Sequence, residues 1–224
     1  LAPAAVEGAM FTPYDPPTDP IEILHEDADM LAVVKPAGLL SVPGRGEELA
    51  DCLISRLAVT FPNILLVHRL DRDTSGVMVF GLTPHAQRTL SMEFETRRAK
   101  KTYFARVWGK LEPREGTVDL PLTVDWPNRP RQMVCHENGR PAVTDWRVVS
   151  YGENETRVRL MPRTGRSHQL RVHMLSKGHV ILGDPIYAEG KARAFPRLML
   201  HSEELRINHP ESGRGMRFRS AAPF

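Results

Sequence analysis

A mostly polar segment, 68–76, runs directly into an apolar one, Val77 to Phe80. A short apolar run that is bounded by turn residues is typical of a buried strand. Asp71 is therefore expected on a loop that a rigid strand holds in place, which is where proteins concentrate functional side chains. A simple turn is the alternative, because the side chains of Asp, Thr and Ser also hydrogen-bond nearby backbone. The segment by itself leaves both interpretations open.

The other apolar segments favour strands over helices. Strands are expected over 21–24, 30–34, 103–108, 116–122, 146–151, 157–161 and 198–207. Helices are expected over 49–60, from Pro84 to the basic residues near 97, and over 167–176, with Ser167 as N-cap and Gly178 as C-cap. Because strands outnumber helices and do not alternate strictly with them, we predict an α+β fold with a mixed, mostly antiparallel sheet.

The beginning of the chain differs in composition from the rest. Five prolines within residues 1–20 predict an extended arm, and residues 21–224 are expected to form a single domain with two lobes. No apolar run approaches the roughly 20 residues that a membrane-spanning helix needs, and no signal-peptide pattern opens the chain. Cys52 and Cys135 lie far apart without a metal-ligand motif. We therefore expect reduced thiols, no metal site and a cytoplasmic protein.

Basic residues are concentrated in two places. No acidic residue occurs from Thr156 to Gly183, a range that carries five arginines and a lysine, and a second basic group spans 97–101. Stretches of one charge sign attract polyanions, and phosphate neutralisation is the main source of nucleic-acid affinity. RNA or DNA is therefore the leading partner class. An ordinary solvated surface is the alternative.

The segment 163–174 carries a second group of chemically versatile side chains. On a helix, Gln169 and His173 would lie on one face, and Arg171 would lie on another. Arg166 and Ser167 at the start of that helix would suit a phosphate, because the free N–H groups there favour anions. If Arg171 lay near Asp71, its charge would keep that carboxylate ionised. Simple packing is the alternative for the histidines.

The polar segment His68–Gly76 resembles the HRLDxxTSG signature of the RluA family of pseudouridine synthases. The resemblance extends over about residues 22–219, because further segments match in the same order: 34–39, 100–103, 164–173, 181–187 and 198–202. It implies the pseudouridine synthase fold, in which helices flank the sheet and RNA binds in a central cleft. The chain departs from the signature only in the variable pair, where Asp73 brings a second carboxylate close to Asp71.

The resemblance implies an isomerase that breaks the C1′–N1 bond of a uridine, rotates the base and joins C1′ to C5. This reaction adds no atoms and changes no oxidation state, so we expect no cofactor and no metal, in agreement with the lack of a GxGxxG or P-loop motif. The resemblance identifies Asp71 as the catalytic carboxylate, Tyr103 as the tyrosine that stacks on the uracil, and Arg171 as the ion-pair partner of Asp71. Nucleophilic attack by Asp71 and deprotonation of C2′ remain alternatives.

The resemblance also implies RNA-binding residues. Arg69 is similar to a residue that enters the space left in the RNA when bases flip out, a step that costs a few kcal/mol. Phosphates are expected to contact Arg98, Lys100, Arg129, Arg166 and His168.

The compact form and the segment 119–130 are most similar to family members that act on both 23S rRNA and tRNA anticodon stem-loops. We expect this dual specificity, no additional N-terminal RNA-binding domain, and a monomer without an obligatory protein partner. Action on one RNA class only is an alternative, and so is a non-catalytic RNA-binding or ribosome-assembly module, which would have no need of Asp71, Tyr103 and Arg171. A glycosidase or nuclease is disfavoured, because no second catalytic acid or metal site is evident.

Overall fold

The computed structural model describes residues 14–224. Its strands are β1 (Glu22–Glu26), β2 (Met30–Lys35), β3 (Leu65–Leu66), β4 (Ser75–Gly81), β5 (Lys100–Trp108), β6 (Glu115–Asp119), β7 (Leu122–Val124), β8 (Gln132–Val134), β9 (Val143–Gly152), β10 (Glu155–Pro162), β11 (Leu200–Asn208) and β12 (Gly215–Arg219). Its helices are α1 (Leu53–Ala58), α2 (Pro84–Glu95), α3 (Gln169–Ser176) and α4 (Gly190–Arg193), with short 3-10 turns η1 (Glu47–Leu49) and η2 (Trp126–Asn128). None of these helices is long and apolar enough to cross a bilayer.

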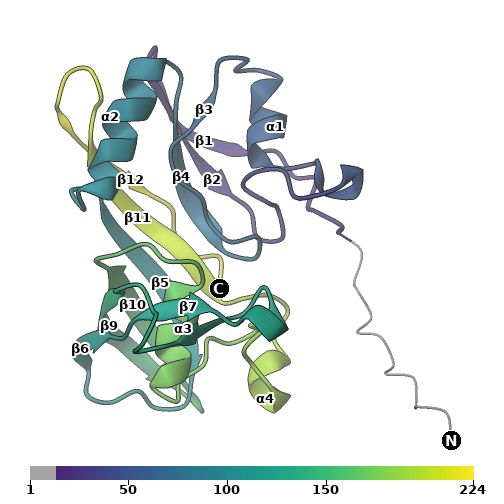
Figure 1. Ribbon diagram of the computed structural model, residues 1–224, viewed down its shortest axis with the longest axis vertical. Coiled ribbons are helices and arrows are strands. Elements are labelled where there is room, and N and C mark those ends of the chain that lie inside the picture. The colour runs from purple at the N-terminus through teal and green to yellow at the C-terminus, as the bar shows by residue number, and fades with distance from the viewer. Residues whose placement is uncertain (1–13) are drawn as a thin grey trace, which may run out of the picture.

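One sheet runs through the whole molecule in the order β1-β2-β4-β11-β5-β10-β9-β6. Two lobes are visible in Figure 1: β1–β4 with α1 and α2 form one, and β6–β10 with α3 and α4 form the other, while β5 and β11 run between them. All neighbouring strands are antiparallel except β4 and β11, which pair in parallel through Ser75 with His201 and Gly76 with Ser202. The predicted α+β fold with a mixed, mostly antiparallel sheet is thus confirmed.

The parallel junction between β4 and β11 depends on Gly76. Its φ is +116°, and a Cβ atom at this position would collide with the backbone of Ser202. Only glycine adopts this conformation without a steric penalty, and only glycine allows so close an approach. Ser75 and Gly76, the last residues of the polar segment, therefore join β4 to β11 immediately after the loop that carries Asp71.

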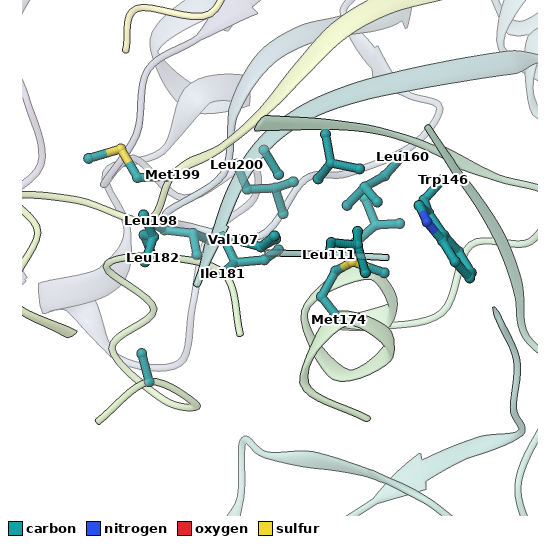
Figure 2. Close-up of a cluster of buried hydrophobic side chains, with 14 of the residues drawn as sticks. Val107, Leu111, Trp146, Leu160, Met174, Ile181, Leu182, Leu198, Met199 and Leu200 are labelled. Atoms are coloured by element: carbon teal, nitrogen blue, oxygen red, sulfur yellow. The ribbon is translucent and has the colours of Figure 1, made fainter. Parts of the chain in front are cut away.

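Each lobe has its own buried core. Every residue of β4 is buried, as expected for a strand covered on both faces, and Phe80 packs with Leu53 of α1. In the other lobe, Met174 of α3 packs in one cluster with Leu160 of β10 and with Trp146 of β9 (Figure 2). These clusters hold the loop before β4 and the helix α3 on opposite sides of the lobe junction.

Two predicted helix starts were wrong. Of the helix expected over 49–60, only Leu53–Ala58 is helical, as α1, and η1 ends at Leu49. The Ser55 hydroxyl accepts the N–H of Cys52 at the start of α1. Ser167 is not the N-cap of α3: His168 takes that position with φ 53°, and no side chain caps the helix. Because α3 begins at Gln169, Arg166 and Ser167 lie on the loop before it and not in its first turn. Gly178, which was expected at the C-cap, follows it: Lys177 is the C-cap, and Gly178 comes next with φ +78°.

Of the predicted proline-rich arm, residues 1–13 lie outside the described residues. Residues 14–20 contain no helix or strand and contact the region around α1. The Tyr14 hydroxyl donates to the carbonyl oxygen of Asp51 at 2.9 Å, and Arg56 donates to the carbonyl oxygen of Pro17 at 2.6 Å. The domain boundaries at 20 and 21 stay a prediction.

Candidate active site

A cavity of about 590 Å³ lies between the two lobes. Asp71 reaches it from the loop before β4, Tyr103 from β5 and Arg171 from α3. Residues 68–71 and Thr74 line it from one lobe, and residues 162–171 line it from the other. The fold therefore brings together three side chains that are far apart in the sequence.

The loop of Asp71 is fixed by a buried lysine and a buried serine. The ammonium group of Lys35, which is fully buried, donates to the carbonyl oxygens of Arg72 at 2.7 Å, Leu39 at 2.6 Å and Pro36 at 2.8 Å. Burial lowers the pKa of Lys35 to about 7, against the opposing effect of the charges of Asp73 and Asp71.

On the other side of Asp71, the Ser41 hydroxyl donates to the carbonyl oxygen of Leu70 at 2.7 Å and accepts the Leu70 N–H at 3.1 Å. The backbone on both sides of Asp71 is thus held by the side chain of Lys35, the last residue of β2, and by that of Ser41 in the segment after it. The carboxylate itself stays accessible, with 31% of its side chain exposed to the cavity.

Arg171 is aimed at Asp71 by a buried carboxylate. The Nε and Nη2 atoms of Arg171 each donate to Asp184 at 2.7 Å, and Nη1 donates to Asp71 Oδ2 at 3.3 Å. Burial disfavours the charge on Arg171, but the hydrogen bonds and charge of Asp184 outweigh it, and the pKa of Arg171 is raised. A charged guanidinium is thus held in one orientation beside the accessible carboxylate.

A second layer of side chains lies behind this pair. The ring of Tyr187 packs 5.1 Å from the guanidinium carbon of Arg171, and its hydroxyl lies 2.8 Å from Nδ1 of His168. His168 Nε2 is 3.9 Å from Asp71 Oδ2. The Tyr187 oxygen accepts the N–H of Gln132 at 2.7 Å, and its hydroxyl also lies 3.4 Å from the Gln132 carbonyl oxygen. Burial lowers the pKa of His168, although the charge of Asp71 opposes this.

Tyr103 and Lys101 enter the cavity from the same strand, two residues apart. Burial, together with the nearby charge of Asp71, raises the pKa of Tyr103. The Lys101 ammonium group donates to the carbonyl oxygen of Thr164 at 3.1 Å, and burial lowers its pKa to about 8. The neutral ring and the cation stand side by side at the cavity wall, which suits a base with its phosphate.

The structure gathers some of the sequence-predicted residues and separates others. Besides the three catalytic candidates, the cavity is lined by Arg69, Arg166 and His168. Three predicted residues do not line it. Arg98 pairs with Glu93 at 2.8 Å, Lys100 bonds the carbonyl oxygen of Arg97 at 3.1 Å, and Arg129 lies in the loop between β7 and β8.

Four residues of the site were not predicted from the sequence: Lys35, Lys101, Asp184 and Tyr187. All four belong to the motif segments 34–39, 100–103 and 181–187, so membership of those segments was the available signal. Asp73, the departure from the signature, pairs with Arg72 at 2.9 Å. The neighbouring Arg72 therefore supplies the ion-pair partner of that second carboxylate.

Within residues 14–224, one group of side chains has the spacing of metal ligands: Asp27, Asp29 and His209. It lies at the turn after β1 and beyond β11, and none of its members lines the cavity. Burial raises the pKa of Asp27, but hydrogen bonds from His25, the N–H groups of Asp29 and Met30, and His209 outweigh it and hold that pKa below its usual range. Nδ1 of His209 accepts backbone N–H groups at 3.2 and 3.3 Å, which keeps the proton on the Nε2 that faces Asp27. These groups hold one another by hydrogen bonds.

Similar solved structures define the class of this fold. Human RNA pseudouridylate synthase domain containing 1 is 28% identical and superimposes with a TM-score of 0.78, covering 94% of this chain and 87% of that one. Human RNA pseudouridylate synthase domain containing 4 is 25% identical, with a TM-score of 0.72 over 90% of this chain and 88% of that one. The fold is thus the pseudouridine synthase fold, as expected.

Sequence comparisons are more specific. The family model for RNA pseudouridylate synthase matches residues 29–176. The dual-specificity RNA pseudouridine synthase RluA of Escherichia coli (strain K12) is 54% identical over 214 residues, which are 94% of this chain and 98% of that protein. The protein of the same name from Yersinia pestis is 52% identical over 90% of this chain and 99% of that protein. This chain belongs to the RNA pseudouridylate synthase family, and it is an isomerase that acts on uridine in RNA.

Proposed function

We propose that Asp71 is the catalytic residue of this enzyme. The observation that carries the proposal is its geometry: an accessible carboxylate at a cavity between the lobes, 3.3 Å from a buried and charged Arg171. A carboxylate can act as nucleophile or as general base, and a fixed guanidinium beside it can orient it for either role. Arg171 is the positioning partner of this carboxylate in the proposal.

The uridine has to leave the RNA stack, because the atoms that react are inaccessible in a stacked base. We infer that the uracil enters the cavity and stacks on Tyr103, with its C1′ close to Asp71. The C1′–N1 bond breaks, the base rotates within the cavity, and C1′ joins C5, after which C5 loses its proton and N1 takes one up, so that no atom is gained or lost overall. Burial and the charge of Asp71 keep the Tyr103 hydroxyl protonated, so it can serve as a hydrogen-bond donor during this rotation.

Basic residues at the cavity support RNA binding. Arg69 and Arg166 line the cavity together with Arg97 and Lys101, which provides positive charge on several sides of the proposed uridine. Arg69 is exposed and is proposed to fill the space that the flipped base leaves. Arg98, Lys100 and Arg129 lie outside the cavity, where contacts with more distant phosphates would suit them.

For the RNA target, we propose both 23S rRNA and the tRNA anticodon stem-loop. The support is the similarity over nearly the whole chain to relatives named dual-specificity RNA pseudouridine synthases. We further propose that residues 21–224 are the catalytic domain and that the enzyme acts as a monomer in the cytoplasm, without a protein partner and without a cofactor.

The catalytic assignment is tested with two neighbouring carboxylates. Asp71→Asn should bind a tRNA anticodon stem-loop as tightly as the wild type and release no tritium from RNA that carries 5-tritiated uridine. Asp73→Asn is the matched control, because Asp73 is two residues away and pairs with Arg72. It should keep most of the activity. Tritium release by Asp71→Asn at a rate near that of the wild type would refute the assignment.

The target assignment is tested in cells. Pseudouridine should be mapped chemically in rRNA and in tRNA from a strain without this gene, and then after the gene is restored. Both the 23S rRNA and the tRNA anticodon position should lose pseudouridine and regain it. Loss from only one RNA class would contradict dual specificity and leave the catalytic proposal intact.

A further inference from the structure

The hairpin formed by β7 and β8 carries an exposed aromatic side chain at its end. Trp126 is 66% exposed, and it is the only aromatic among the large exposed hydrophobic residues of the described chain. Trp126 is the first residue of η2. It directly follows Asp125, whose N–H donates to the carbonyl oxygen of Arg131 across the hairpin. A single exposed apolar side chain is common on protein surfaces, so the groups around this indole decide what it can bind.

An arginine covers one face of this indole. The guanidinium carbon of Arg129 lies 4.6 Å from the centre of the Trp126 ring, and its Nε donates to the Trp126 carbonyl oxygen at 3.3 Å. No carboxylate in residues 14–224 lies within ion-pair distance of Arg129. The acidic residue of this loop, Asp125, accepts the side-chain amide of Asn128 at 2.9 Å instead. The end of the hairpin thus combines a flat ring with a cation that no acid neutralises.

This hairpin is connected to the catalytic cluster through a few short contacts. The Gln132 N–H donates to the Tyr187 hydroxyl at 2.7 Å, that hydroxyl lies 2.8 Å from His168, and His168 is 3.9 Å from Asp71. Arg131 also packs on the Tyr187 ring at 5.0 Å and donates to the carbonyl oxygen of Ile186. Two side chains therefore separate the hairpin backbone from the carboxylate at the reacting uridine.

We propose that the end of the β7–β8 hairpin, Trp126 with Arg129, is a second RNA-contact surface, on which an unpaired base flanking the target uridine stacks. This inference rests on the proposed function. An unpaired base suits the surface because every base has a π-face, and stacking on an aromatic ring contributes substantially to single-strand binding. The free guanidinium of Arg129 suits the phosphate of the same nucleotide. An acidic protein surface is the competing occupant, and it has no flat base to match the indole.

Intrinsic fluorescence provides a direct test, because the chain has three tryptophans and Trp126 is the exposed one, whereas Trp146 is buried. In the Asp71→Asn background, a tRNA anticodon stem-loop should quench the emission, and Trp126→Phe should abolish most of that quenching. Trp126→Phe keeps an aromatic ring and should keep the affinity. Trp126→Ala should weaken the affinity by roughly 5- to 150-fold, the range expected for one lost base stack. Val59→Ala removes part of an exposed apolar side chain beside α1 and should leave the affinity unchanged.

RNAs that lack a single loop base identify the nucleotide that stacks. Two affinities are compared: that of the Asp71→Asn protein for an abasic RNA, and that of the Asp71→Asn, Trp126→Ala double variant for the intact RNA. At one flanking position, the two affinities should be equally weak. The two losses should not add when they are combined, because both remove the same contact. Additive losses at every position, or an affinity that Trp126→Ala leaves unchanged, would overturn the inference.

The two proposals fail in different ways. If the wild-type chain forms no pseudouridine in any tested RNA, the proposed function fails. If it forms pseudouridine and Trp126→Ala binds RNA as the wild type does, only the inference about the hairpin fails. Melting temperatures of the variants should match that of the wild type, because Trp126 is exposed and packs only against Arg129 among the aromatic and cation contacts of the described residues.

Discussion

Arg171 donates to Asp71 across one hundred residues of sequence, at 3.3 Å, while its other two donor nitrogens bind Asp184 at 2.7 Å each. Asp184 is completely buried and also accepts the N–H groups of Ile186 and Tyr187 at 2.9 and 3.0 Å. The short contacts are thus on the buried side and the long one is on the cavity side. Arg171 is held by Asp184, which leaves its remaining nitrogen to accompany the carboxylate that faces the substrate.

Asp184→Asn should impair both folding and catalysis. The substitution leaves the charge of Arg171 buried without its main partner, which costs about 3–5 kcal/mol in comparable pairs. Arg171 also loses its orientation, so we expect kcat to fall. Urea unfolding and tritium release measure the two effects. Asp145→Asn is the control, because it breaks a pair with the exposed Arg163 and should cost at most about 1 kcal/mol. Equal losses for both variants would contradict this account.

Gly76→Ala should destabilise the protein far more than Gly178→Ala. Both glycines have positive φ, +116° and +78°, so both substitutions introduce backbone strain of about 1 kcal/mol or more. Only the methyl group at Gly76 would collide with the backbone of Ser202, whereas nothing lies within 4 Å of the position at Gly178. Melting temperatures measure the difference. A similar decrease in melting temperature for the two variants would show that the β4–β11 junction tolerates a side chain.

RNA affinity should decrease as the pH rises through about 8. Burial lowers the pKa of Lys101 to about 8, so its charge is present below that pH and is lost above it. Lys101→Gln should weaken binding at pH 7, flatten this pH dependence and reduce the slope of log K against log salt concentration by about 0.7–0.9. Lys110→Gln, which removes an exposed lysine paired with Glu112 at 2.8 Å, is the control. If Lys101→Gln has the same slope of log K against log salt concentration as the wild type, Lys101 does not contact a phosphate.

The free energy of unfolding should fall with acid below pH 6.5. Burial lowers the pKa of His68 to about 3 and that of His201 to about 4, so the folded protein resists protons that the unfolded chain accepts near pH 6.5. The stability is fully present above pH 6.5 and is lost as the pH falls toward those folded values, by at most about 1.4 kcal/mol per pH unit for each histidine.

Urea unfolding between pH 4.5 and 7 tests this behaviour. His68→Gln should make the slope shallower, because glutamine keeps an acceptor for the Val79 N–H, which the ring accepts at 3.1 Å, without binding a proton. The exposed His136→Gln should keep the slope of the wild type. If His68→Gln also keeps that slope, His68 is not a source of acid sensitivity.

Much of the fold could be predicted from local patterns. The apolar run after Gly76 and the alternating segments after Lys100 were enough to predict strands and an α+β fold, because periodicity reports which side chains face a core. The helix boundaries that depend on capping were harder to predict from the sequence. The start of α1 depends on the Ser55 hydroxyl, and the start of α3 depends on the left-handed backbone of His168. β12 was missed, since its pairing with β11 is decided by tertiary contacts.

By itself, the sequence determined the family, the fold class and the candidate residues Asp71, Tyr103 and Arg171, because their motifs are local and their order along the chain is specific. Only the tertiary structure decided that these three line one cavity and that Asp184 orients Arg171. The physical reason is that contacts between residues one hundred positions apart depend on how the two lobes join. That junction rests on the parallel pairing of β4 with β11, which local periodicity does not record.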